Sequence, residues 1–505
     1  MKKSLLLLSV LALLGCSQAV NTPVLTIEGG QVQGVTTDLP GVIVYRGIPY
    51  AAPPIGDLRW KEPQPVVPWQ GVRLCDKFGH PGYQAVHYPG GYTTEWGYGD
   101  ESPYSEDCLY LNVWTKASGQ PAKKLPVALW IHGGGYREGW GSEPEFDAQE
   151  WGAKDVVLVS INYRLGVFGF LTHPELSAES PHGVSGNYGI LDQIEALKWI
   201  KKNIAQFGGD PDNVMIFGQS AGAGSVKTLC ESPLARGLFH KAVIMSGGGM
   251  TVPAAAPAAP AAPAAPAAGR AAAAPAGRGA APAAMSRMMF RAMSPKEAEQ
   301  QNKEVMDWAG LTDLKKMRAA STETIYALAN IYNAASGKFA FLTGSPVVDG
   351  YVCKESFDDA AKDGSLADVP YMIGYTLNDM GDMAGGIAAF CLNREEKGAK
   401  AWAYEFARPL PDDGSHPEVT ARLKGAFHSS DLWFVFKSLK HCWRPWTQGD
   451  WDLSEKMLTA WTNFAKTSDP GLGWAPYTKD NGKFMLFKLN AQDQEASECG
   501  DPIKP

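Results

Sequence analysis

Several features that would define a class of protein are missing from this chain of 505 residues. It has no tract of basic residues and no glycine-rich phosphate-binding loop, and its net charge of -7 at pH 7 argues against nucleic acid as a partner. Its eight cysteines form no C-x-x-C pair and no cluster with histidines at metal-ligand spacing, so we expect neither a metal site nor a cofactor. Beyond the first 15 residues, no apolar run is long enough to cross a bilayer.

The N-terminus has the pattern of an export signal. Two lysines precede an apolar stretch from Leu5 to Leu14, which is too short to span a membrane stably. The following L-L-G-C ends at Cys16 and resembles a bacterial lipobox, in which the cysteine becomes the lipidated first residue of the mature chain. We therefore expect residues 1–15 to be a signal peptide and 16–23 a tether. The exported protein would be held on the periplasmic or cell-surface side of a membrane by its lipid anchor alone. The alternative is an ordinary secretory signal in which Cys16 is incidental.

A short apolar run near the middle of the chain ends in a G-x-S-x-G motif. Residues 214–225 read VMIFGQSAGAGS, which places Ser220 at the centre of the motif. The pattern predicts a nucleophile elbow, a sharp strand-to-helix turn that exposes the serine hydroxyl and needs glycines because backbone segments approach closely. Upstream, apolar residues recur at helical spacing over 187–209, and another apolar run follows at 240–246. This order of helix, strand, turn, helix and strand predicts an α/β protein with a parallel sheet.

A second glycine cluster lies upstream of the elbow, in the stretch LPVALWIHGGGYREGW at 125–140. When a serine attacks an ester, negative charge develops on the carbonyl oxygen, and each preorganised backbone N–H group aimed at it is worth about 3 kcal/mol. Consecutive glycines let the backbone come close enough to donate. We predict an oxyanion hole made by the amides of Gly134, Gly135 and Ala221, the residue after the predicted nucleophile.

Further motifs follow one another along the chain. They are YRGIPYAAPPIGDLRW from Tyr45, SEDCLYLNVW from Ser105, IHGGGY from Ile131, INYRLGVFGFL from Ile161, GNYGILDQIEALKWI from Gly186, FGGDPDNVMIFGQSAGAGS from Phe207 and WTNFAKTSDPG from Trp461. Together they resemble the type-B carboxylesterases, a family that includes the cholinesterases and bacterial p-nitrobenzyl esterases. The resemblance implies an α/β-hydrolase fold, with a large, mostly parallel central sheet flanked by helices, as a single domain over residues 24–505. At about 251–293 an Ala/Pro-rich, low-complexity insertion interrupts it.

The resemblance also implies a catalytic triad in the chain order Ser, acid, His. The matching stretch GAFHSSDLWFVF makes His428 the general base and acid. The family carries its acid five positions after a glycine that ends an apolar strand, and counting from Gly374 reaches Asp379. Many relatives have Glu before the nucleophile, whereas this chain has Gln219, so we expect no special preference for choline-type esters. The alternatives for the acid are Asp382, Asp349 and Asp431.

The resemblance further implies a disulfide bond between Cys75 and Cys108, which closes a loop that lines the gorge mouth in relatives. The loop is rich in aromatic residues, which either contact aryl or acyl groups of a substrate or attach the loop to the body. Trp96 in this loop, together with Tyr136 and Gln219, is a candidate for the substrate pocket. Cys230 is the expected free thiol, and the pairing of four cysteines stays open: Cys353, Cys391, Cys442 and Cys499.

Two classes of function fit these motifs. The first is a serine carboxylic-ester hydrolase that works through an acyl-enzyme on uncharged short-chain or aryl esters. Alternative substrates for it are plant polysaccharide esters, as for a feruloyl-type esterase, or the esters cleaved by a lipase. The second class is a cholinesterase-like binding protein. Members of the family take this role when the nucleophile is lost. The presence of Ser220, Asp379 and His428 favours the enzyme, whose partner would be a small-molecule or polymer-linked ester.

Overall fold

The structure is a computed structural model that describes residues 22–99, 103–252, 294–338, 340, 342 and 344–489, and the backbone of 496–499. The predicted signal peptide and Cys16 lie outside the described residues, as do nearly all of the predicted tether and insertion. Within the described part of the chain, no helix combines the length and the apolar character that a membrane span requires.

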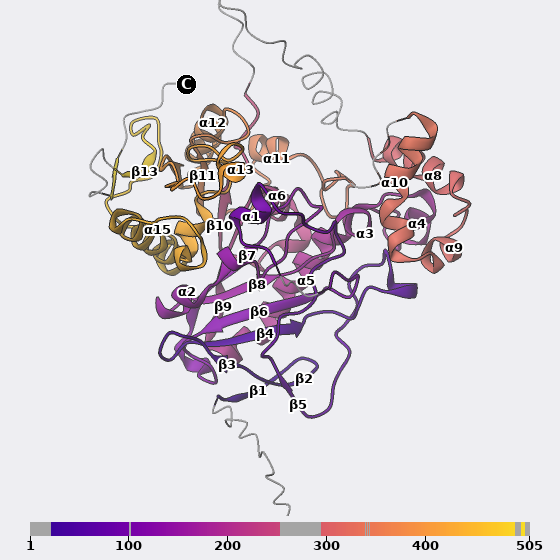
Figure 1. Ribbon diagram of the computed structural model, residues 1–505, viewed down its shortest axis with the longest axis horizontal. Coiled ribbons are helices and arrows are strands. Elements are labelled where there is room, and N and C mark those ends of the chain that lie inside the picture. The colour runs from indigo at the N-terminus through magenta and orange to yellow at the C-terminus, as the bar shows by residue number, and fades with distance from the viewer. Residues whose placement is uncertain are drawn as a thin grey trace, which may run out of the picture.

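A mixed sheet of 11 strands runs through the molecule in the order β14-β13-β12-β11-β10-β9-β7-β8-β6-β4-β3 (Figure 1). Its central strands, from β8 to β13 in this order, pair in parallel, and the outer strands pair antiparallel. A small sheet has the order β1-β2-β5. The strands are β1 (Val24–Ile27), β2 (Gly30–Gln33), β3 (Val35–Thr36), β4 (Ile43–Pro49), β5 (Val72–Leu74), β6 (Tyr110–Thr115), β7 (Leu125–Ile131), β8 (Val157–Ile161), β9 (Gly209–Gln219), β10 (Lys241–Met245), β11 (Tyr371–Thr376), β12 (Ala401–Phe406), β13 (Met485–Leu489) and β14 (Ala496–Cys499).

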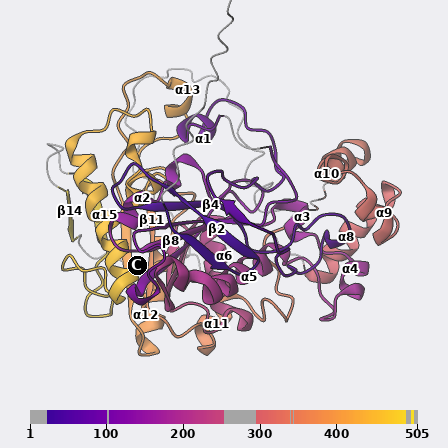
Figure 2. The same ribbon diagram turned by 90° about the horizontal axis from the view of Figure 1, so that it is seen from below.

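Helices cover both faces of the large sheet (Figures 1 and 2). The α-helices are α1 (Tyr92–Glu95), α2 (Gln149–Ala153), α3 (Gly166–Phe170), α4 (Pro174–Glu179), α5 (Tyr188–Asn203), α6 (Ala221–Glu231), α8 (Pro295–Trp308), α9 (Leu314–Ala319), α10 (Thr322–Ser336), α11 (Phe357–Asp363), α12 (Ala384–Glu396), α13 (Pro417–Thr420), α14 (Leu432–Phe436) and α15 (Gln448–Thr467). Short 3-10 helices are η1 (Gly56–Leu58), η2 (Pro121–Lys123), η3 (Pro144–Phe146), η4 (Ile204–Phe207), η5 (Pro233–Ala235) and η6 (Leu439–His441).

Side chains of β7 alternate between two hydrophobic cores. Leu129 and Ile131 belong to the core that includes residues of α5, α6 and α12, whereas Ala128 and Trp130 belong to the core that includes residues of α14 and α15. Because successive side chains of a strand point to opposite faces, the two cores lie on opposite faces of the sheet. Both faces of the sheet are therefore buried. This explains why the central strands are apolar throughout and do not alternate apolar with polar residues.

The predicted helix before the elbow is confirmed. It is α5, continued by the short helix η4, and it ends at Gly208, whose φ is 79°. A side chain at Gly208 would also collide with Ala117, because an added Cβ would lie 2.3 Å from the Ala117 Cβ. The chain then enters β9 and reaches the elbow, and the apolar run at 240–246 forms β10 beside it.

The predicted disulfide bond between Cys75 and Cys108 is wrong for this structure, in which both are buried free thiols. The two side chains turn to different neighbours: the Cys75 Sγ lies 3.7 Å from the Arg73 carbonyl oxygen, whereas Cys108 lies near Asp192 and Arg164. Burial raises the pKa of Cys75 to about 12 and that of Cys108 well above its usual range, so neither is a reactive thiolate near neutral pH. The other cysteines with described side chains are free as well: Cys230, Cys353, Cys391 and Cys442.

A buried ion pair joins the segment after β8 to α5. The Arg164 guanidinium donates to Asp192 through Nε at 2.8 Å and Nη2 at 2.6 Å, and the Arg164 backbone N–H donates to the same carboxylate at 3.0 Å. Its remaining donors reach the carbonyl oxygens of Lys61 and Tyr188. Both charged side chains are almost fully buried. Each therefore requires the opposite charge of the other to offset the cost of its removal from water.

We predict that Asp192→Asn lowers the free energy of unfolding by about 3 to 5 kcal/mol, because it leaves the Arg164 charge buried without a counter-charge. Denaturant unfolding followed by circular dichroism measures the change. The control is Asp212→Asn, which removes an exposed carboxylate paired with Lys201 and should leave the stability close to that of the wild type. A loss below about 1 kcal/mol in Asp192→Asn would show that the pair is dispensable.

Candidate active site

Ser220 occupies a strained turn between β9 and α6. Its φ is 57° and its ψ is -121°, and its N–H donates to the Met245 carbonyl oxygen at 2.9 Å. A Cβ at Gly222 would lie 2.0 Å from the Ile131 carbonyl oxygen, and one at Gly218 would lie 2.5 Å from the Gly222 carbonyl carbon. Only glycine fits at either position, so the predicted elbow is present as a close approach of β7, β9 and the start of α6.

The glycine cluster after β7 packs directly against this elbow. A Cβ at Gly133 would lie 3.2 Å from the Ser220 Cβ, and Gly134 and Gly135 have φ values of 87° and 61°. Among the described residues, none accepts a hydrogen bond from the amides of Gly134, Gly135 or Ala221. Ala221 thus follows Ser220 in the chain, and Gly134 and Gly135 lie in the turn that packs against it. The amides of all three predicted donors have no acceptor among the described residues.

His132 holds the glycine turn in place. Its Nδ1 lies 3.0 Å from the Gly133 carbonyl oxygen, and its ring stacks on Tyr163 at 4.4 Å between centroids. Burial lowers the pKa of His132 to about 3, although the Gly133 carbonyl favours the charged form. The ring is therefore neutral at working pH, and it adds no charge beside the turn.

His428 and Asp379 form a hydrogen-bonded pair. The His428 Nδ1 lies 2.5 Å from the Asp379 Oδ1, and the Asp379 side chain is fully buried. Burial alone would raise the pKa of Asp379, but the hydrogen bond and the electrostatic interaction with the His428 ring outweigh burial and hold that pKa below its usual value. An ionised carboxylate only accepts hydrogen bonds, so His428 Nδ1 carries the proton and Nε2 keeps a lone pair. The His428 Nε2 is then the atom that can take a proton from a nucleophile.

Gln219 lies on the free side of the His428 ring. Its Nε2 is 3.2 Å from the His428 Nε2, and it immediately precedes Ser220 in the chain. The amide can donate to the imidazole lone pair while no substrate is present. This contact places His428 at the elbow and puts a neutral group, not a carboxylate, next to the base.

Two loops meet to form the His428–Asp379 pair. The Asn378 N–H donates to the Ala426 carbonyl oxygen, and the Ala426 N–H donates to the Asn378 Oδ1, both at 2.9 Å. Tyr92 of α1 adds a hydrogen bond from its hydroxyl to the His428 carbonyl oxygen at 2.9 Å. The sequence analysis did not identify Asn378, because its partner lies 48 residues away and no local pattern links the two.

The three alternative acids have other contacts. The Asp349 carboxylate accepts from three consecutive backbone N–H groups, those of residues 351–353, and from the Asn187 amide. Asp382 accepts from the Ala384 N–H at the start of α12. Asp431 accepts from the Tyr404 hydroxyl at 3.2 Å. Among the four candidates in the described chain, Asp379 is the one that hydrogen bonds with His428.

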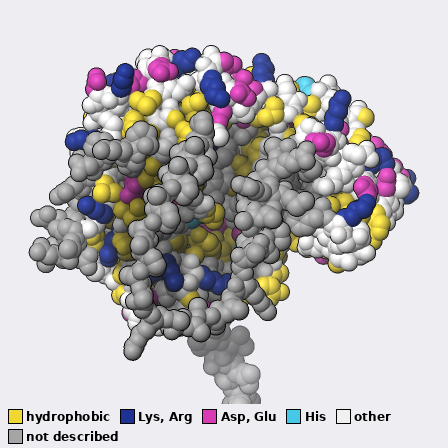
Figure 3. All heavy atoms as spheres, turned by 90° about the horizontal axis from the view of Figure 1, so that it is seen from above, with side chains coloured by type: hydrophobic (Ala, Val, Ile, Leu, Met, Phe, Trp, Pro, Cys, Tyr) yellow, Lys and Arg dark blue, Asp and Glu magenta, His cyan; other side chains and the backbone are white. Residues whose placement is uncertain are grey.

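The predicted pocket residues differ in their environments. Trp96 is 4% exposed and packs against Trp433 and Tyr92, so it belongs to the core rather than to an open pocket wall. The Tyr136 ring packs edge-on against Phe170, and its hydroxyl lies against Gly224 of α6. Most aromatic residues of the 75–108 loop likewise attach it to the body. On the side of the molecule where α12 and α13 lie in Figure 1, Figure 3 shows a hollow in which hydrophobic side chains gather.

The large mixed sheet flanked by helices is the fold of the α/β-hydrolases, as in the solved carboxylesterase structures that the chain resembles. Residues 21–389 and 383–500 match the sequence profile of the carboxylesterase family, and the chain belongs to this family. It is a carboxylic ester hydrolase.

Several named relatives cover much of the chain. The fumonisin B1 esterase of Sphingopyxis macrogoltabida is 34% identical over 409 residues, which are 79% of this chain and 65% of that protein. The para-nitrobenzyl esterase of Bacillus subtilis (strain 168) is 32% identical over 95% of this chain and 96% of its own length. Among solved structures, a thermophilic pNB esterase has a TM-score of 0.72 at 26% identity and covers 94% of this chain and 97% of its own. The Geobacillus stearothermophilus carboxylesterase EST55 has a TM-score of 0.70 at 28% identity and covers 95% and 97%.

In the part of the chain that the structure describes, no group of three or more histidine, cysteine, aspartate or glutamate side chains is placed to hold a metal ion.

Asp431 is a second buried carboxyl beside the His428–Asp379 pair. Burial, together with the negative charge of Asp379, raises the pKa of Asp431 to about 7. The unfolded chain would release this proton at a much lower pH, so the folded state favours the protonated form. The stability that this group contributes is therefore complete below about pH 4 and is lost as the pH rises to about 7.

We predict that Asp431→Asn removes this loss, because the amide stays neutral at every pH. Between pH 5 and pH 8, the free energy of unfolding of the variant should rise by about 2 to 3 kcal/mol relative to that of the wild type. Denaturant titrations at the two pH values measure the difference. Asp382→Asn, the same substitution at an exposed acid, is the control and should follow the wild type. A difference that does not change with pH would mean that Asp431 is already ionised at pH 5.

Proposed function

We propose that this hydrolase uses Ser220 as its nucleophile and forms an acyl-enzyme with uncharged short-chain or aryl esters. The observation that carries the proposal is the His428–Asp379 hydrogen bond at 2.5 Å, with the free ring nitrogen of His428 held against Gln219 at the Ser220 elbow. A base with an oriented lone pair beside the half-buried Ser220 supports nucleophilic catalysis, in which the base takes the serine proton.

The reaction proceeds in two halves. The Ser220 Oγ attacks the ester carbonyl carbon while its proton passes to the His428 Nε2, and the carbonyl oxygen becomes an oxyanion. The amides of Gly134, Gly135 and Ala221 stabilise this charge, and His428 returns the proton to the departing alkoxide as the ester C–O bond breaks. Water then attacks the acyl-enzyme and gives a proton to His428, and His428 passes this proton to the Ser220 Oγ as the acyl C–O bond breaks and the acid leaves.

Two neutral side chains beside the elbow, Gln219 and His132, support uncharged substrates. Gln219 supplies an amide where a carboxylate would attract a cation, and His132 beside the glycine turn is neutral. The gathering of hydrophobic side chains in the hollow of Figure 3 suits apolar acyl or aryl groups. Both relatives are named as esterases, which supports an ester as the substrate. Their names specify different compounds, fumonisin B1 and para-nitrobenzyl, so they do not indicate one particular ester.

We predict that Ser220→Ala lowers kcat for p-nitrophenyl acetate and butyrate by roughly 10⁵-fold or more, because no other group can form the acyl-enzyme. Steady-state release of p-nitrophenol measures the change, with methyl ferulate and a triglyceride as further substrates. The matched control is Ser225→Ala in the same helix, whose hydroxyl accepts a hydrogen bond from Gln193 and which should keep most of the activity. Activity that persists in Ser220→Ala would refute the mechanism, and a wild type inactive on every ester would favour a binding protein.

We predict that Gln219→Glu moves the acid limb of the pH profile of kcat/KM to higher pH by about one unit, because a carboxylate there stabilises the protonated His428. It should also increase the relative kcat/KM for a choline ester over its neutral analogue. Gln219→Met, which removes the amide without adding charge, is the control and should leave the acid limb in place. If Gln219→Glu changes neither the pH profile nor the selectivity, the electrostatic role assigned to this position is wrong.

A further inference from the structure

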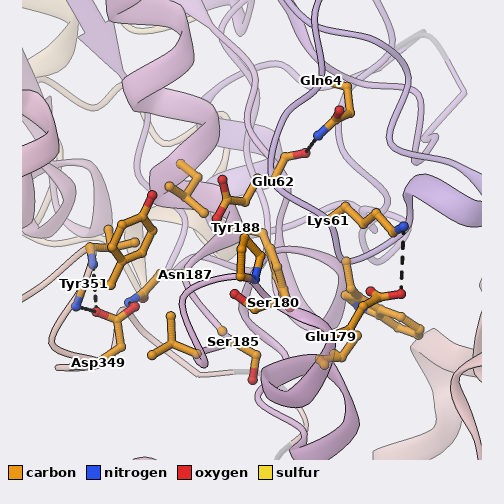
Figure 4. A pocket seen from close by; sticks show the side chains of 17 residues that line it. Lys61, Glu62, Gln64, Glu179, Ser180, Ser185, Asn187, Tyr188, Asp349 and Tyr351 are labelled. Atoms are coloured by element: carbon orange, nitrogen blue, oxygen red, sulfur yellow. Dashed lines mark hydrogen bonds and ion pairs between the residues drawn. The ribbon is translucent and has the colours of Figure 1, made fainter.

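A second cavity, of about 230 Å³, lies between the chain after η1, the C-terminal end of α4, the start of α5 and residues 349–352. None of the residues that line it belongs to the elbow, the glycine turn or the His428–Asp379 pair. Figure 4 shows Tyr351 and Asp349 on one side of the cavity and Lys61 and Glu179 on the other, with Glu62 and Tyr188 between them. The described part of the fold leaves this space unfilled, and the chemistry of its walls indicates which ligand they would recognise.

The walls combine aromatic and apolar surface with carboxylates. Tyr188 and Tyr351 contribute rings, and the apolar side chains are Leu176, Val184, Leu191 and Val352. The carboxylates are those of Glu62, Glu179 and Asp349, against one lysine, Lys61. Flat apolar surface next to negative charge favours a flat ligand that carries a positive charge.

Glu62 is the carboxylate that remains available to a ligand. Asp349 already accepts from backbone N–H groups and from the Asn187 amide. Glu179 is bound at both oxygens by Arg318, at 2.7 and 2.5 Å, and also lies 3.8 Å from Lys61. In the described part of the chain, Glu62 pairs with the His182 ring at 3.5 Å, and 37% of the Glu62 side chain is exposed.

The protein itself already stacks a planar nitrogen-containing group on each of the two tyrosines. The His182 ring lies on Tyr351 with centroids 3.7 Å apart and an interplanar angle of 14°, and the same ring reaches Glu62. The Arg164 guanidinium lies 5.4 Å from the centre of the Tyr188 ring. An imidazole held between a tyrosine face and Glu62 shows how an external planar cation would bind.

We propose that this cavity is a binding site for a planar organic cation, such as an amidinium or guanidinium joined to an aromatic ring. The ring lies against Tyr188 and Tyr351, and the charged end pairs with Glu62 in place of His182. The site is separate from the ester-cleaving centre, so the proposal does not depend on the catalytic roles assigned above.

Isothermal titration calorimetry on the full chain tests the proposal, with benzamidinium as the probe and neutral benzamide as its near-isosteric control. The wild type should bind benzamidinium at least fivefold more tightly than benzamide. Glu62→Gln should weaken benzamidinium binding by about fivefold or more and leave benzamide unchanged, since it removes the charge and keeps the shape. Glu195→Gln, which removes the same charge from α5 at a residue that does not line the cavity, should bind as the wild type does.

A gain of binding provides a second test that misfolding cannot imitate. His182→Ala frees both Glu62 and one face of Tyr351, so it should tighten benzamidinium binding by about threefold or more. The gain should disappear in the double variant with Glu62→Gln. Equal binding of benzamide and benzamidinium, an unchanged affinity in Glu62→Gln, or an unchanged or weaker affinity in His182→Ala would each overturn the proposal.

Discussion

The close approach of backbone at the elbow is the constraint on which the candidate site depends. A Cβ at Gly222 would meet the Ile131 carbonyl oxygen at 2.0 Å, so α6 can begin where it does only because this residue has no side chain. The same approach sets the glycine turn after β7 against Ser220, and the positive φ of Ser220 follows from the abrupt change from β9 to α6. One packing contact thus positions both Ser220 and the glycine turn proposed to supply the oxyanion donors, and a methyl group at Gly222 would disturb both at once.

The second part of the site comes from chain segments that the sequence separates widely. Asp379 follows β11, whose register beside β10 brings it to the same edge of the sheet as Ser220, because carboxyl ends of neighbouring parallel strands meet there. The loop with His428 is fixed to the Asp379 loop by the reciprocal hydrogen bonds of Asn378 and Ala426. The His428–Asp379 distance is therefore set by backbone pairing rather than by the two side chains alone.

The sequence allowed prediction of those parts of the site that depend on local chemistry. Ser220 and its glycines were found because a tight turn restricts which residues fit, and α5 because its apolar residues recur at helical spacing. Counting from motif positions also led to His428 and Asp379 as a pair, and the structure brings them into contact.

Long-range packing limited the rest of the prediction. Trp96 was expected near substrate but lies in a core of residues from distant segments, and the two cysteines of the expected disulfide turn to different neighbours. The proton on Asp431 depends on burial and on the nearby charge of Asp379, neither of which is visible in the sequence around it.

Arg164 attaches the walls of the second cavity to helix α5. It follows β8, pairs with Asp192 inside α5, and donates to the carbonyl oxygens of Lys61 and Tyr188, two residues that line the cavity. Its guanidinium also lies over the Tyr188 ring. The cavity walls are therefore attached to the same buried ion pair that fixes α5 against the sheet. A ligand entering the cavity would meet Lys61 and Tyr188 already held in place, and the reorganisation that its binding requires is the displacement of His182 from Glu62.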